Sequence, residues 1–227
     1  MSITAKSKFG IVVKEMNMGK TLARALLSAS LNRLFSEDAE LSKSAKILEI
    51  GGQPASHQRY MPPAWQLTLS NYKMLAGVDL IIDAEKEFPS DIGEFDGVVC
   101  FNALYIIKDY FNCFSESLKL AKKFVIFNIP LIQALVPEPN DFTRLTEDRI
   151  NDLIEELMKS HKIAGARIIP VGGSFSAAVS LIDPYLKFRV LRLPFYLSAV
   201  ALDKLDSKIG RRSPIMYLVV IKKSYEQ

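Results

Sequence analysis

Apolar positions recur along the chain with two spacings, and the two spacings alternate. Leucines at helical spacing predict an amphipathic helix over Gly19–Phe35, and similar patterns predict helices over Tyr110–Lys122 and over Glu147–Ser160 with Thr146 as its N-cap. Between and around these helices lie short apolar or β-branched runs bounded by polar or turn residues. They predict strands at Lys46–Ile50, Trp65–Leu69, Asp79–Ile82, Gly97–Phe101, Phe124–Asn128, Arg167–Val171 and Met216–Ile221.

This alternation predicts an α/β fold, with a seven-stranded and mainly parallel sheet covered by helices on both faces. A chain of 227 residues, 49% of them hydrophobic, is long enough to bury one sizeable core, so we expect a single domain over residues 1–227. Ligands of such sheets bind at the carboxyl ends of the strands, near the point where the strand order reverses.

The first strand ends in the most informative segment of the chain, in which the carboxylate of Glu49 is followed by Gly51 and Gly52. Glycine has no Cβ, so the backbone can turn sharply there and approach a bound ligand closely. Gly19-Lys20-Thr21 resembles the end of a phosphate-binding P-loop, but the position five residues before Gly19, which a P-loop fills with glycine, is Lys14.

Four segments together resemble the class I S-adenosylmethionine-dependent methyltransferases, in particular a methyltransferase type 11-like branch found near glycan and lipid-sugar pathways. They are Ile47–Gly52, Asp79–Ala84, Phe88-Pro89 together with Glu94–Leu104, and Pro139–Thr146, which contains Asp141 and Arg144. The resemblance covers about Lys46 to Leu157. It implies a Rossmann-like fold, S-adenosylmethionine as cofactor, and methyl transfer to a small molecule, a glycan or a lipid-linked sugar.

The resemblance also implies roles for individual residues. Glu49, Gly51 and Gly52 would hold the methionine and ribose side of the cofactor, with Asn71 where the family usually has a ribose-binding acid. Asp83 and Ala84 would lie beside the adenine. Phe101 and Asn102 would close over the cofactor near its sulfonium and line the substrate entrance.

The sequence departs from the family pattern at several of these points. Gln53-Pro54-Ala55 makes the first loop stiffer than a glycine-rich one, Asn71 offers a neutral amide, and Leu104-Tyr105 replaces an acidic-histidine pair. An alternative is therefore a degenerate, non-catalytic protein of the same fold that acts through a partner or a membrane. A nicotinamide-dependent oxidoreductase is the weakest alternative, because the chain lacks GxGxxG and an acid after the second strand.

Methyl transfer requires alignment and exclusion of water more than it requires catalytic side chains. A hydroxyl acceptor would need a base or hydrogen-bond acceptor, for which the candidates are His57, Tyr105 and Asp141. His57 lies in a polar segment, which is more typical of a solvated loop histidine. Tyr105 lies on a mostly apolar face, which is more typical of a partly buried packing residue than of a catalytic one. Asp141 and Arg144 are equally compatible with a structural clamp after the fifth strand and with substrate binding by Arg144.

The composition of the chain argues against several classes of partner and ligand. The net charge of +4 is spread along the chain without a basic run interleaved with aromatics, so nucleic acid is not expected. Cys100 and Cys113 lack CxxC spacing, which favours reduced thiols in a cytoplasmic compartment, and with only two histidines a metal site is not expected. Neither a signal-type h-region nor an apolar run of about 18 residues is present.

A segment of about residues 183–210 precedes the last strand and predicts a covering helical insertion, interrupted near Pro194. Its apolar positions share one helical face, and its basic residues favour peripheral contact with an anionic membrane surface through residues 183–212. Packing against the core or against a second copy in a homodimer is the simpler interpretation. The apolar set is Leu186, Val190, Leu193, Leu197, Val200, Ala201 and Leu205, and the basic set is Lys187, Arg189, Arg192, Lys204, Lys208, Arg211 and Arg212.

Overall fold

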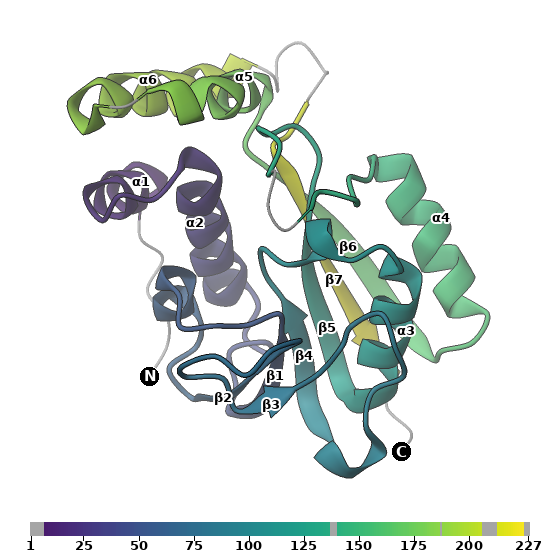
Figure 1. Ribbon diagram of the computed structural model, residues 1–227. Helices are drawn as coiled ribbons and strands as arrows, with labels where there is room; N and C mark the ends of the chain where they lie inside the picture. The colour runs from purple at the N-terminus through teal and green to yellow at the C-terminus, as the bar shows by residue number, and fades with distance from the viewer. Residues whose placement is uncertain (1–6, 137–139, 187, 206–212, 225–227) are drawn as a thin grey trace.

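A computed structural model describes residues 7–136, 140–186, 188–205 and 213–224 of the protein. Its centre is a seven-stranded sheet with the order β3-β2-β1-β4-β5-β7-β6, in which β7 runs antiparallel to both of its neighbours. The strand order reverses between β1 and β4, which pair in parallel. The α/β prediction with a mainly parallel sheet is confirmed (Figure 1).

All seven predicted strands form, most of them longer than predicted. The shortest is β3, which keeps two residues of the predicted Asp79–Ile82 and pairs with the end of β2. The strands are β1 Ala45–Ile50, β2 Trp65–Asn71, β3 Leu80–Ile81, β4 Phe95–Cys100, β5 Ala121–Pro130, β6 Ile163–Val171 and β7 Met216–Lys223.

Successive residues of the central strands enter two separate cores, one on each face of the sheet. In β1, Ile47 packs into the core beneath α2 (Leu22–Glu37), whereas its neighbour Leu48 packs into the core beneath α3 (Tyr110–Leu120) and α4 (Glu147–Met158). Both side chains are fully buried. A strand that is buried on both faces has apolar residues at consecutive positions, which explains Ile47, Leu48 and Ile50, with the buried Glu49 as the exception.

The three helices predicted before the insertion form, and the one predicted cap, Thr146, is confirmed. Thr146 accepts a hydrogen bond from the N–H of Arg149 at the start of α4, and the carboxylates of Glu147 and Asp148 in its first turn favour the helix dipole. The first predicted helix begins three residues later than expected, because Gly19 has φ +76° and forms the turn before α2, whose N-cap is Thr21.

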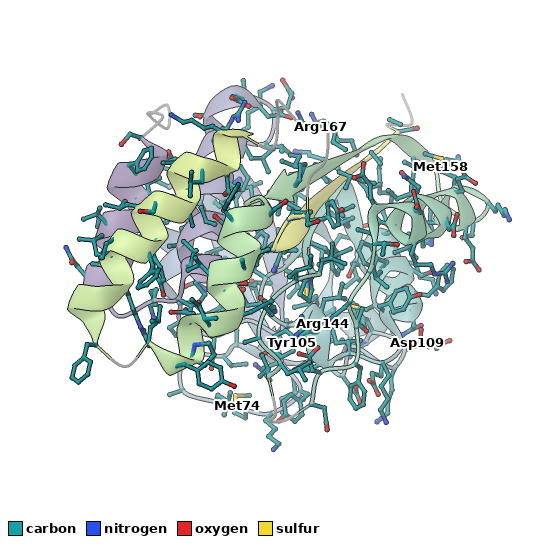
Figure 2. The ribbon with its side chains drawn as sticks, turned by 90° about the horizontal axis from the view of Figure 1, so that it is seen from above. Met74, Tyr105, Asp109, Arg144, Met158 and Arg167 are labelled. Atoms are coloured by element: carbon teal, nitrogen blue, oxygen red, sulfur yellow. The ribbon has the colours of Figure 1, made fainter. Side chains whose placement is uncertain are left out.

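Three further helices complete the face that carries α2, and two of them form the helical insertion between β6 and β7, which begins at Ser174 rather than near the predicted residue 183. These are α1 Lys8–Asn17, α5 Ser174–Ile182 and α6 Arg189–Leu202, with α5 and α6 side by side beyond the carboxyl ends of the strands (Figures 1 and 2). The predicted interruption near Pro194 is wrong, since α6 continues through it. Burial of Tyr196, Ala199 and Val200 against the core offsets the backbone hydrogen bond that proline cannot donate. Lys187 and residues 206–212, with Lys208, Arg211 and Arg212, lie outside the described residues.

Candidate functional site

The predicted site residues collect at one edge of the sheet. Strands β1, β2, β3 and β4 are mutually parallel, so their carboxyl ends meet there. The edge is built from Glu49 and the residues after β1, from Asn71 at the end of β2, from Asp83 and Ala84 after β3, and from Phe101 and Asn102 after β4.

Glu49 is fully buried, and its carboxylate is held from the loop that follows β1. The Nε2 atom of His57 lies 2.9 Å from Oε1 of Glu49, and Nε2 of Gln58 donates to Oε2 over 2.9 Å. The interpretation of His57 as a solvated loop histidine is wrong: its exposed fraction is 7%, and its ring packs edge-on against Phe101. A buried carboxylate requires hydrogen-bonding partners, and His57 is one of the two side chains that supply them to Glu49.

Gln58 also closes the loop that replaces the family's glycine-rich turn. Its Nε2 donates to the carbonyl of Gln53, and its Oε1 accepts from the N–H of Ala55. The stiff Gln53-Pro54-Ala55 stretch is therefore tied back to the same glutamine that holds Glu49.

Gly51 is required at its position by the protein itself. It has φ +66°, and a Cβ added to it would lie 2.3 Å from the Cβ of Ala103. The turn after β1 therefore lies against the residue that follows Asn102, which brings the ends of β1 and β4 together.

Asn71 reaches from the end of β2 to the same turn. Its Nδ2 donates to the carbonyl of Gly52 over 3.3 Å, and its Oδ1 is buried with no hydrogen-bond partner in the described part of the chain. Buried polar atoms are rarely left unpaired, so this acceptor has unused capacity at the predicted cofactor edge.

Asp83 and Ala84 lie beyond β3 at the rim of this edge. Hydrogen bonds from Lys86 and from the N–H of Glu85 hold the pKa of the Asp83 carboxyl below its usual value. The carboxylate remains 44% exposed despite these partners. It is therefore ionised and accessible at neutral pH.

Asn102 adopts a left-handed backbone conformation at φ 54°, the only such non-glycine residue found among those described. Its N–H donates to Oδ1 of Asn128 near the end of β5 over 2.6 Å. Asparagine tolerates this conformation better than most residues, and such backbone outliers often occur at functional sites. The preceding Phe101 is buried beneath it.

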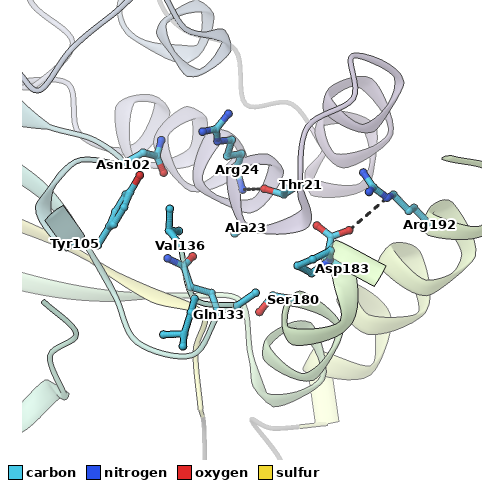
Figure 3. Close-up of a pocket in the computed structure, with 13 residues that line it drawn as sticks. Thr21, Ala23, Arg24, Asn102, Tyr105, Gln133, Val136, Ser180, Asp183 and Arg192 are labelled. Atoms are coloured by element: carbon cyan, nitrogen blue, oxygen red, sulfur yellow. Dashed lines mark hydrogen bonds and ion pairs between the residues drawn. The ribbon is translucent and has the colours of Figure 1, made fainter. Parts of the chain in front are cut away.

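A cleft of about 420 Å³ adjoins Asn102 (Figure 3). It lies between the start of α2, the segment after β5 and the α5–α6 insertion. The residues that line it are Thr21, Ala23, Arg24, Asn102, Tyr105, Gln133, Ala134, Leu135, Val136, Ser180, Asp183, Pro184 and Arg192.

Of the three predicted bases, Tyr105 alone lines this cleft. Burial raises the pKa of its hydroxyl, Asp141 raises it further, and the charge of Arg24 opposes the rise. The phenol is therefore protonated at neutral pH and suits donation or acceptance of a hydrogen bond better than removal of a proton. His57 is instead occupied by Glu49 beneath the loop.

Asp141 and Arg144 form a clamp on the segment after β5, and Figure 2 shows the position of Arg144. The guanidinium donates to both carboxylate oxygens of Asp141 and to three carbonyls, those of Leu131, Gln133 and Ala134. These bonds use all five of its N–H groups, so Arg144 has none left for a substrate. The geometry favours the clamp over substrate binding for this pair.

Sequence reasoning missed Gln58, Arg24 and Asp183. Gln58 and Arg24 carry no local signal, because nothing in their neighbourhood marks them as facing Glu49 or the cleft. In the sequence Asp183 marks only the start of the predicted insertion, whereas in the structure it is 3% exposed and its carboxylate accepts a hydrogen bond from Tyr196.

In the described part of the chain, no group of His, Cys, Asp and Glu could hold a metal ion, and no helix is long and apolar enough to cross a membrane.

Comparison with known proteins identifies the fold. No protein-family model matches the sequence, and no curated protein matches it significantly. Solved structures do match. The plantazolicin methyltransferase BpumL in complex with SAH is 13% identical, with 94% of this chain and 89% of that chain covered and a TM-score of 0.56. The CurJ carbon methyltransferase is 12% identical over 96% of this chain and 59% of that one, also with a TM-score of 0.56.

A third matching structure is named for a different activity. The [4+2]-cyclase SpnF is 14% identical, with 87% of this chain and 81% of that chain covered and a TM-score of 0.51. Similarity of fold therefore does not fix the reaction. What the sheet order and these matches establish together is the architecture: the chain has the Rossmann-like fold of the class I S-adenosylmethionine-dependent methyltransferases.

Proposed function

We propose that the protein transfers a methyl group from S-adenosylmethionine to a small molecule bound in the cleft. The observation that carries this proposal is the position of Asn102, which belongs to the polar edge of the sheet and also lines the cleft. A cofactor held along that edge and an acceptor held in the cleft would meet at this residue.

The residues at the edge fit such a cofactor. Asn71 lies at the end of β2 with an Oδ1 that has no partner in the described part of the chain, and rotation of its buried carboxamide would present this acceptor to a ribose hydroxyl. Asp83 offers an exposed carboxylate to an adenine amine, beside Ala84. His57 and Gln58 already occupy the carboxylate of Glu49, so Glu49 would act on the cofactor through the loop that it fixes. Gly51 and Gly52 would keep that loop close to the edge of the sheet.

The bound cofactor would supply a methyl group on a sulfonium, which is a good leaving group. The protein would contribute alignment and a dry site. Phe101 is buried next to Asn102 and would contribute apolar surroundings, and Tyr105 would orient a hydroxyl acceptor through a hydrogen bond. The Asp141–Arg144 clamp would act indirectly, by fixing the segment that forms the wall from Gln133 to Val136.

Calorimetric titration of the cofactor-stripped protein with S-adenosylmethionine and with S-adenosylhomocysteine tests this function. Micromolar binding of both ligands, followed by methyl transfer to a candidate acceptor, is the expected result. Absence of binding at millimolar ligand would overturn it. That outcome would favour the alternative of a non-catalytic protein, in which the stiffened loop and the neutral Asn71 have abolished the cofactor site.

We further propose that the acceptor is a small molecule, glycan or lipid-linked sugar reached at a membrane surface. The insertion carries many of the large apolar side chains that are exposed, and the most exposed of them, Tyr185 and Phe188 at 81% and 70%, follow the cleft residue Pro184. Exposed apolar patches of this kind mark interaction sites, and the basic residues of 183–212 suit an anionic lipid surface. The apolar set is Phe175, Leu181, Ile182, Tyr185, Phe188, Phe195 and Leu202.

Co-sedimentation with phosphatidylglycerol vesicles tests this contact. The wild type should bind, Tyr185→Ser/Phe188→Ser should bind less, and Met158→Ser should bind like the wild type. Met158 is 47% exposed but lies on α4, away from the insertion, which makes it a matched control (Figure 2). The wild type could instead fail to bind vesicles and have a molecular mass that doubles as its concentration rises. If the double variant then remained a monomer, this surface would be assigned to a homodimer.

A further inference from the structure

The cleft carries more positive than negative charge. Among its described lining residues, Arg24 and Arg192 are cationic and Asp183 is the one acid. The Asp183 carboxylate is already engaged: it accepts from the hydroxyl of Tyr196 and lies 3.6 Å from Nε of Arg192. Arg192 also donates to the carbonyl of Leu186 over 2.6 Å. The charges of Asp183 and Arg192 therefore largely neutralise each other.

Arg24 is different. It stands in the first turn of α2, where its backbone N–H donates to Oγ1 of Thr21. Its guanidinium makes no hydrogen bond or ion pair with any residue that the structure describes. Arg24 lines the cleft from an exposed position, with its guanidinium on the side of Asn102 (Figure 3). A guanidinium presents five N–H donors in a planar arrangement that matches carboxylate and phosphate groups.

Tyr105 lies on the same side of the cleft as Arg24 and Asn102 (Figure 3). Its hydroxyl also has no hydrogen-bond partner among the described residues. Because the pKa of this hydroxyl is raised, it keeps its proton at neutral pH and can donate it in a hydrogen bond. A cation and a neutral donor on one wall are suited to an anion, since hydrogen bonds to a charged group are stronger than those between neutral groups.

We infer that Arg24 binds an anionic group, a phosphate or a carboxylate, of the acceptor. This inference rests on the proposed function for its assignment of the cleft to the acceptor. The cofactor brings a carboxylate of its own, but the cleft is lined by α2, by the segment after β5 and by the insertion. Of the residues expected to hold the cofactor, Asn102 alone lines it.

Titration of the SAH-saturated protein with phenyl phosphate, and separately with phenol, tests the inference. Wild-type protein should bind phenyl phosphate, and Arg24→Gln should bind it roughly tenfold to a hundredfold more weakly, as expected for loss of a charged hydrogen-bonding partner. Phenol should bind both proteins equally. Arg33→Gln should behave as wild type, because Arg33 lies on the same helix with a 78% exposed side chain paired to Glu37.

Two outcomes would overturn the inference. In the first, the wild type does not distinguish phenyl phosphate from phenol. In the second, Arg24→Gln weakens SAH binding and leaves phenyl phosphate binding unchanged, which would assign Arg24 to the cofactor's carboxylate. Failure of the proposed function is a separate result: if SAH does not bind, the same titrations of the ligand-free protein still decide whether Arg24 recognises an anion.

Discussion

The backbone N–H of Asn102 donates to the side-chain oxygen of Asn128 over 2.6 Å, and this bond joins the loop after β4 to the end of β5. Asn128 is 3% exposed, so its carboxamide is fixed by the core while the residue it holds reaches the cleft. The left-handed conformation of Asn102 is thus supported from the neighbouring strand, which is how strained residues persist in folded proteins.

Removal of this support should affect stability and ligand binding together. We expect Asn128→Ala to lower the free energy of unfolding by about 1–3 kcal/mol, because the N–H of Asn102 loses its acceptor. SAH affinity should also fall, since Asn102 would no longer be held in place. Urea denaturation and calorimetry measure the two effects. Asn151→Ala, at an exposed position of α4, should change neither, and equal effects in both variants would contradict the assignment.

Gly51→Ala should destabilise the protein by about 2–4 kcal/mol, because it adds backbone strain at positive φ to a clash with Ala103. Gly93→Ala is a control without a clash: its φ is +79° and its ψ −173°, a combination adopted almost only by glycine, but an added Cβ would meet nothing within 4 Å. It should therefore show backbone strain alone, at about 1–3 kcal/mol. Adding Ala103→Gly to Gly51→Ala should restore part of the loss, as urea denaturation of the double variant would show. Strictly additive effects would refute the contact.

Asp83→Ala should weaken binding of S-adenosylmethionine by about 1–3 kcal/mol through loss of a hydrogen bond to the adenine, while the fold survives. Calorimetry measures the affinity, and circular dichroism checks the fold. The control is Asp91→Ala, which removes an exposed carboxylate at the 3-10 turn before β4. A folded Asp83→Ala protein with unchanged affinity would remove this residue from the cofactor site.

The Asp141–Arg144 clamp should make stability depend on pH. Burial raises the pKa of Asp141, but hydrogen bonds from Arg144 and from the N–H of Val136 outweigh it, so the folded value lies below the ordinary 3.8. A depressed pKa contributes stability that is fully present above 3.8 and is lost as pH falls through the folded value.

Asp141→Asn should therefore be less stable than the wild type at pH 7. The difference should shrink as pH falls below 3.8, because protonation then removes the same charge from the wild type. Urea denaturation from pH 7 to pH 3 measures it. The other carboxylates titrate in both proteins, so the comparison isolates Asp141. A difference that stays constant across this range would show that the clamp does not depend on its charge.

The spacing of apolar residues is sufficient to predict most of the architecture, because it specifies strands and long helices locally, although α1 and α5 were not predicted from it. The apolar runs placed all seven strands, and Thr146 placed the start of α4 through its cap. The segment Glu49–Gly52 and the other strand ends lie at one edge of the sheet, as predicted, since parallel strands bring their carboxyl ends together.

The contacts that these residues make follow from the tertiary structure and not from any local pattern in the sequence. His57 reads as a loop residue in sequence, yet it is buried because the chain folds back over Glu49. Pro194 reads as a helix breaker, but packing of the residues after it keeps α6 continuous. Arg24 and Tyr105 are 81 positions apart and reach one cleft only because α2 lies beside the end of β4. Such contacts depend on long-range packing, which no local pattern encodes.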